Sequence, residues 1–96
     1  MSFIDSELTE ECITSASFDS LEKALEHFGY DVVRTKLQIT ARRGGVFKTN
    51  GKFSTVVVTD SGNFRSCRDT ETAKGYLMRP KPGVLAQIVA FAEELE

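Results

Sequence analysis

The stretch FDSLEKALEHFGYDVV (residues 18–33) decides the fold, because it contains a helix, the end of that helix and the start of a strand. Its apolar side chains recur three or four residues apart, at Phe18, Leu21, Leu25 and Phe28. This stripe predicts an amphipathic helix over residues 18–28. Asp19, followed three residues later by Glu22, has the pattern of a capping box at its start. Gly29 stands where a left-handed residue ends a helix, since glycine takes a positive φ without a Cβ clash.

Strand patterns lie on both sides of this helix. Residues 11–17 are rich in β-compatible side chains and predict a short strand. Residues 30–41 partly alternate between apolar and polar side chains and predict a second strand. Residues 53–59 predict a central buried strand, and residues 64–67 predict the strand that returns from a turn at 60–63.

The remaining third of the chain predicts helices. Asp69 is placed to cap a short helical turn over residues 71–77. Two prolines make residues 79–83 a rigid connector, and residues 84–95 have the apolar stripe of a second amphipathic helix. The residues predicted to lie in the core include Leu21, Leu25, Phe28, Val57, Ile88 and Leu95.

Two amphipathic helices and several short strands bury their apolar sides best when the helices lie on a sheet. We therefore predict an α+β fold: a single two-layer domain over residues 1–96, with an antiparallel β-meander and two amphipathic helices packed on one face. Residues 1–10 are polar and acidic and are expected to form a loose N-terminal segment.

The composition is that of a soluble globular domain, with 96 residues, 41% of them hydrophobic and 27% charged. No apolar run approaches the roughly 20 residues that cross a bilayer, and the first residues lack the pattern of a secretory signal. A cytoplasmic protein without a membrane partner is expected. Cys12, Cys67 and a single histidine are too few for a four-ligand zinc site, so we expect reduced cysteines, no metal and no cofactor.

The net charge of −2 conceals a strong segregation of charge. Residues 1–33 carry a net charge of −7, residues 34–81 carry +8, and residues 82–96 carry −3. Such blocks occur in domains whose charged elements neutralise each other after folding. They also occur in domains with a polyanion-binding face, and the composition leaves both readings open.

The basic block is densest around residues 42–52, where cationic and aromatic side chains flank Gly44-Gly45 and Asn50-Gly51. Arginine and lysine neutralise phosphates, glycine lets backbone amides approach a ligand, and an exposed phenylalanine can stack on a base. The alternative is a solvated hairpin tip with its phenylalanine folded onto the sheet edge. The predicted polyanion-binding residues are Arg42, Arg43, Phe47, Lys48, Lys52, Arg65 and Arg68.

No catalytic motif is present. A P-loop needs four residues between its glycines and a hydroxyl after its lysine, whereas five residues separate Gly45 from Gly51 and Phe53 follows Lys52. No dinucleotide-binding G-x-G-x-x-G occurs. His27, at the edge of the apolar stripe, is expected to be solvated, as are the paired acids at residues 10–11 and 93–94. We therefore predict no catalytic residues and no enzymatic activity.

The segment LEKALEHFGY, residues 21–30, resembles a family of cyanobacterial, chloroplast and phage proteins that is named as a hypothetical chloroplast reading frame. In that family a helix runs into a Leu-Gly-Tyr-like turn and then into a strand. Residues 53–69 are loosely similar too, so the resemblance covers about half of the chain, and residues 42–52 depart from the family in being basic and glycine-rich. The resemblance implies the helix-turn-strand fold and carries over no catalytic residues.

Two functional hypotheses follow. The first is a small non-enzymatic binding module, of phage or bacterial origin, whose basic loop binds a polyanion such as nucleic acid or a nucleotide. The alternative is a protein-interaction or inhibitor module that binds an acidic surface of a host or partner protein, or forms a homodimer over its open sheet face.

Overall fold

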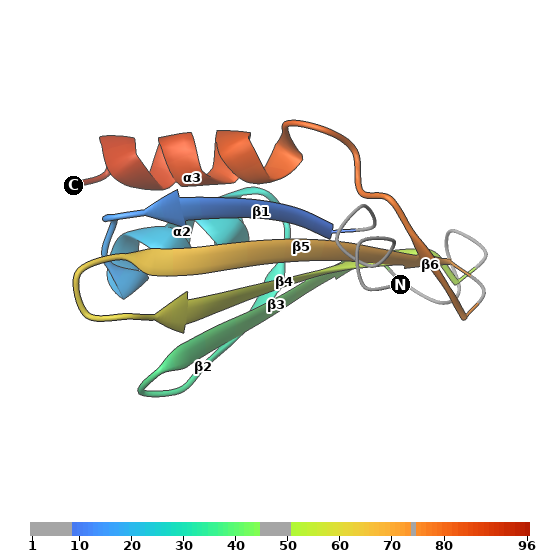
Figure 1. Ribbon diagram of the computed structural model, residues 1–96, viewed down its shortest axis with the longest axis horizontal. Helices are drawn as coiled ribbons and strands as arrows, with labels where there is room; N and C mark the ends of the chain where they lie inside the picture. The colour runs from blue at the N-terminus through green and yellow to red at the C-terminus, as the bar shows by residue number, and fades with distance from the viewer. Residues whose placement is uncertain (1–8, 45–50, 74) are drawn as a thin grey trace.

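An antiparallel sheet forms one layer of the molecule and two helices form the other, as Figure 1 shows. The computed structural model describes residues 9–44, 51–73 and 75–96. The strand order is β1-β5-β4-β3-β2, and β6 pairs with β5. The elements are β1 (Thr9–Thr14), α2 (Phe18–His27), β2 (Asp31–Arg34), β3 (Gln38–Gly44), β4 (Phe53–Asp60), β5 (Arg65–Ala73), β6 (Tyr76–Met78) and α3 (Val84–Glu94).

The predicted α+β class and the antiparallel meander are confirmed. Strands β2 to β5 follow one another across the sheet, and β1 joins the far edge beside β5. β1 pairs with the first part of β5 and β6 pairs with its last part, so these two strands share one edge. The chain after β6 therefore leaves this edge close to the start of β1 before it enters α3.

Both helices cover the same face of the sheet, which we call the inner face. Alternate residues of β3, β4 and β5 point to this face and form the core with the apolar stripes of α2 and α3. The other face, the outer face, carries no helix (Figure 1). The core consists of Ala16, Phe18, Leu21, Ala24, Leu25, Tyr30, Ile39, Ala41, Val56, Val58, Cys67, Leu85, Ile88, Val89 and Ala92.

Half of the predicted core is confirmed. Leu21, Leu25 and Ile88 are no more than 1% exposed. Val57 is only half-buried, because Val56 and Val58 take the inward positions of β4 and the strand alternation turns Val57 to the outer face.

Two further core positions were also predicted wrongly or only in part. Leu95 is 45% exposed, since it follows the end of α3 and leaves the helical stripe. Phe28, which caps the end of α2, is half-buried and packs against the edge of the core.

The N-cap of helix α2 lies two residues before Asp19, the cap that the acidic residues suggest. The cap is Ser17, whose hydroxyl accepts from the amide of Ser20. The predicted capping pair instead binds a neighbouring strand: Arg34 Nη1 lies 2.5 Å from Asp19 and 3.2 Å from Glu22. The left-handed conformation of Gly29, with φ of 89°, is confirmed.

Two element predictions were wrong. Residues 30–41 form β2 and β3, two strands of a hairpin, because the chain turns at 35–37. The predicted helical turn over residues 71–77 falls on the end of β5 and on β6, since the end of β5 pairs with β4 on one side and with β6 on the other. This pairing supplies the backbone hydrogen bonds that a single helical turn leaves open. The first strand begins at Thr9 rather than residue 11, and residues 1–8 lie outside the described residues.

One acid of each pair near the chain ends, Glu10 and Glu93, makes specific contacts, whereas Glu11 and Glu94 are exposed. Glu10 accepts from the amides of Gly83 at 3.0 Å and Leu85 at 3.4 Å, so this β1 side chain caps α3, whose own N-cap residue has no side chain. At the other end of α3, Glu93 accepts from the hydroxyl of Thr14 at 2.8 Å. Glu96 accepts from the hydroxyl of Ser17, the N-cap of α2, and from the hydroxyl of Ser20 in its first turn.

Candidate anion-binding site

The alternation of strand β3 places its two adjacent arginines on opposite faces of the sheet. Ile39 and Ala41 point to the inner face and are fully buried. Arg43 is next in the same series and lies on the helix side, whereas Arg42 lies on the outer face. The two arginines therefore cannot act as one basic patch, although they are neighbours in the sequence.

Arg43 is held in place by the turn that follows α2. Its guanidinium lies over the ring of Tyr30, 4.9 Å from the ring centre, and its Nη1 donates to the carbonyl of Phe28 at 3.1 Å. These two contacts orient the arginine across the open end of the inner face.

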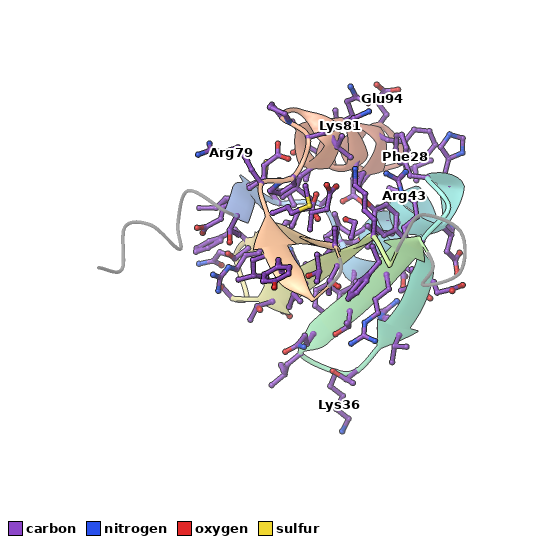
Figure 2. The ribbon with its side chains drawn as sticks, turned by 90° about the vertical axis from the view of Figure 1, so that its right-hand side faces the viewer. Phe28, Lys36, Arg43, Arg79, Lys81 and Glu94 are labelled. Atoms are coloured by element: carbon purple, nitrogen blue, oxygen red, sulfur yellow. The ribbon has the colours of Figure 1, made fainter. Side chains whose placement is uncertain are left out.

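A cavity of about 230 Å³ lies at this end of the sheet, where β3 ends and β4 begins. Three cationic residues from three segments of the chain, Arg43, Lys52 and Lys81, line it. Figure 2 looks onto this end and shows Arg43 and Lys81 on the helix side of the sheet, far from Lys36 at the β2–β3 turn. The lining residues are Arg43, Gly44, Lys52, Phe53, Ser54, Glu71 and Lys81.

Lys81 reaches the cavity from the connector between β6 and α3. The amide of Gly83, two residues further on, is bound by Glu10, so the end of this connector is tied to the sheet. On the opposite wall, Lys52 Nζ lies 3.3 Å from the carboxylate of Glu71. The cavity therefore has one anionic wall residue against three cationic ones.

Gly44 lets the two strands close tightly at the cavity. A Cβ atom at this position would lie 2.7 Å from the carbonyl oxygen of Lys52, and the φ of 102° is in the left-handed region. A side chain here would push the end of β3 away from the start of β4. The glycine is thus needed for the close approach of the two strand backbones, whereas the sequence suggested that the glycines of this segment allow the approach of a ligand.

A buried polar chain lies behind the cavity wall. Ser54 donates to Asp69 at 2.7 Å, and the hydroxyl of Tyr30 lies 3.4 Å from the same Ser54 oxygen. Asp69 is only 2% exposed, and burial raises the pKa of its carboxyl. Glu10 and Glu71 add to this rise, while the hydrogen bond from Ser54 and the charge of Arg43 oppose it.

The other predicted site residues are dispersed. Arg68 lies on the outer face with Arg42, and each stands opposite an acid of the neighbouring strand. Arg65 lies at the far end of β5, where its Nε is 3.4 Å from Asp60 and its Nη1 donates to the carbonyl of Ser15. Phe47 and Lys48 lie outside the described residues.

Of the predicted residues, the structure brings Arg43 and Lys52 together and adds residues that the sequence did not indicate. Lys81 stands between two prolines 38 positions after Arg43, and no local pattern connects the two. Ser54 is two residues before Val56 in β4, so strand alternation places both on the inner face and could have indicated its position. Its hydrogen bond to Asp69, however, depends on the register of β4 and β5.

The two cysteines and the histidine show no arrangement for nucleophilic catalysis in the part of the chain that the structure describes. Burial raises the pKa of Cys67 to about 12 and also raises the pKa of Cys12, so both thiols are protonated at neutral pH. The ring of His27 is stacked on Phe91 with ring centres 4.3 Å apart. Over the described ranges 9–44, 51–73 and 75–96, no cluster of three or more His, Cys, Asp or Glu side chains is arranged to hold a metal ion.

The sequence matches no protein-family model and no curated protein. The resemblance of residues 21–30 to the chloroplast reading-frame family therefore stays a prediction. None of the helices in the part of the chain that the structure describes has the length and apolar character needed to cross a membrane.

Proposed function

We propose that this chain is a non-enzymatic binding module that holds a phosphate group of a polyanionic ligand, a nucleic acid or a nucleotide, in the cavity around Arg43. The observation that carries the proposal is that Arg43, Lys52 and Lys81 line one cavity, in a chain whose overall charge is negative. Three cationic donors from separate segments provide what a phosphate needs, because each anionic oxygen gains a charge-assisted hydrogen bond.

The surroundings of Arg43 also support an anion site. The stacking on Tyr30 and the bond to Phe28 hold the guanidinium before a ligand arrives, so little side-chain entropy is lost on binding. The protonated thiols and the stacked histidine support a binding role without catalysis.

The test is a titration with a short single-stranded DNA that carries a 5′-phosphate, followed by fluorescence anisotropy at low salt. Arg43→Gln and Lys81→Gln should each weaken binding about tenfold, as expected when a charge-assisted hydrogen bond is lost. The matched controls are Arg42→Gln on the outer face and Lys36→Gln at the distant turn, which remove the same charges. Equal losses in variants and controls would contradict the proposal.

A second candidate is an interaction module that binds another copy of itself, or an acidic protein surface, through the outer face. The observation that favours it is the exposure of Ile13 (68%) and Val33 (66%) on a face that carries no helix. Arg42 stands opposite Asp31 there, so the face offers both charge signs to a partner. Sedimentation of the chain and of Val33→Glu would test it, because a dimer over this face should dissociate in the variant.

The cytoplasmic location and the phage or bacterial origin belong to the same proposal. Cys12 and Cys67 stand opposite each other in β1 and β5 as free thiols, which suits a reducing compartment. The small size and charged composition suit a phage or bacterial binding protein. Mass determination of the chain from cytoplasmic extract, with and without thiol labelling, checks the redox state.

A further inference from the structure

The cavity wall offers hydrogen-bond acceptors as well as cationic donors. Glu71, whose carboxylate already pairs with Lys52, is one lining residue, and Ser54, whose side chain carries a hydroxyl, is another. A site that only neutralised a fully deprotonated anion would gain nothing from either group. Their presence therefore says something about which anion fits.

The acceptor character of Ser54 follows from its hydrogen bonds. A hydroxyl has one proton and two acceptor lone pairs. Ser54 donates its proton to Asp69 at 2.7 Å, so the Tyr30 hydroxyl at 3.4 Å must be the donor in the second contact. One lone pair of the Ser54 oxygen is left, and a group that uses it has to bring its own proton.

We infer that the cavity selects a phosphate group that still carries a proton, which means a terminal phosphate monoester or inorganic phosphate rather than a backbone diester or sulfate. In this arrangement Arg43, Lys52 and Lys81 bind the anionic oxygens, and the P–OH group donates to Ser54. A phosphate monoester has a second pKa near 6, so a proton remains on a large share of molecules at mildly acidic pH. A diester and sulfate have no proton to give, and their oxygens would face the Ser54 lone pair and Glu71.

Asp69 fixes this preference by keeping the Ser54 proton pointed away from the cavity. It lies in β5, and the charged groups that face it are Glu10 on β1, Glu71 on its own strand and Arg43 on β3. Its carboxylate is buried and cannot turn to water, so the direction of the Ser54 hydroxyl is set by the fold. Asp69 thus acts as a positioning residue, because it reaches the ligand only through Ser54.

The inference rests on the proposed function, and the experiment separates the two. Isothermal titration at about pH 6, where the monoester retains a proton, compares inorganic phosphate with sulfate at equal ionic strength. The same experiment compares a short DNA strand with and without its 5′-phosphate. We expect sulfate and the unphosphorylated strand to bind about tenfold more weakly or worse, since each lacks the hydrogen that the site accepts.

Ser54→Ala tests the assigned residue, with Thr55→Ala as its matched control on the outer face of the same strand. Ser54→Ala should lower the affinity for phosphate and should not lower that for sulfate, while Thr55→Ala should change neither. If Ser54→Ala does not fold, the comparison of phosphate with sulfate on the unmodified chain still tests the selectivity.

Three results would count against the inference. Equal binding of phosphate and sulfate, with loss of both in Arg43→Gln, would overturn the selectivity and leave the proposed function standing. A preference for phosphate that survives Ser54→Ala would overturn the role of Ser54. Absence of binding for every anion would overturn both the selectivity and the proposed function.

Discussion

Removal of the Glu10 side chain should destabilise the fold through helix α3. This carboxylate accepts from the Gly83 amide at 3.0 Å and, less closely, from the Leu85 amide at 3.4 Å. Gly83 is the N-cap and has no side chain, and the first turn of α3 contains no acidic residue. In Glu10→Ala the amides at the start of α3 therefore lose an anionic partner that the helix itself does not supply.

The expected cost is about 1–2 kcal/mol, which combines the loss of a typical side-chain cap with the loss of a negative charge at a helix N-terminus. For a domain of this size each kcal/mol lowers Tm by roughly 4–8 °C, so the variant should melt about 4–16 °C lower. Urea unfolding followed by circular dichroism measures the free energy of unfolding directly.

The matched control is Glu11→Ala, the next residue of β1, whose side chain is exposed on the outer face. Its loss should change the free energy of unfolding by no more than about 0.5 kcal/mol. The reasoning is refuted if the two variants are equally stable. Because Gly83 ends the connector that carries Lys81, Glu10→Ala should also weaken phosphate binding, whereas Glu11→Ala should not.

Three further predictions concern the core, the buried acid and the thiols. Leu25→Ala, at a fully buried position, should lower the free energy of unfolding by about 2–5 kcal/mol. Leu95→Ala, at a position that is 45% exposed, should lower it far less, and urea unfolding of both variants measures the difference. The pKa of Asp69 is raised in the folded state, so the free energy of unfolding should fall as the pH rises from 3.8, the ordinary pKa of an aspartate, through the raised pKa. Asp69→Asn should flatten this part of the curve of stability against pH. In native protein at pH 8, an alkylating reagent should modify Cys12 before Cys67, whose pKa is about 12, and equal rates measured by mass spectrometry would contradict the assigned burial.

The two helices were predictable because their apolar stripes are local and their ends carry local signals. The spacing from Phe18 to Leu25 and the glycine at residue 29 locate α2 within one residue of its observed end. The actual cap, Ser17, was missed because the acidic pair looked like a capping box. Asp19 and Glu22 instead pair with Arg34 of β2, and this contact depends on the folded arrangement of α2 and β2.

The strands show where local reasoning fails. Three consecutive valines at 56–58 fit a strand in either register, and only pairing with β3 and β5 decides that Val57 faces outward. Likewise, β3 extends to Gly44, and its alternation places Arg42 and Arg43 on opposite faces. The sequence predicted a loop from residue 42 onward, because this segment is rich in glycine. The sequence therefore pointed to the segment that supplies Arg43 and Lys52 to the cavity, but it treated residues of two sheet faces as one site.

Lys81 and Asp69 were beyond prediction for a different reason. Lys81 reaches the cavity because the connector after β6 crosses to the inner side, where Glu10 holds its end. Asp69 looked like a helix cap, and its burial beneath Ser54 depends on the register of β4 and β5. Both are consequences of contacts between residues far apart in the chain.

The most direct test of the anion site is to follow the arginine side-chain Nε–H signals by NMR while phosphate is added. Arg42 and Arg43 are adjacent in sequence and lie on opposite faces of β3, so each serves as the other's control. With the cavity as the binding site, the Arg43 signal should shift and saturate while the Arg42 signal stays in place. A saturating shift of Arg42 and Arg68, with Arg43 unmoved, would place the anion on the outer face and contradict the account.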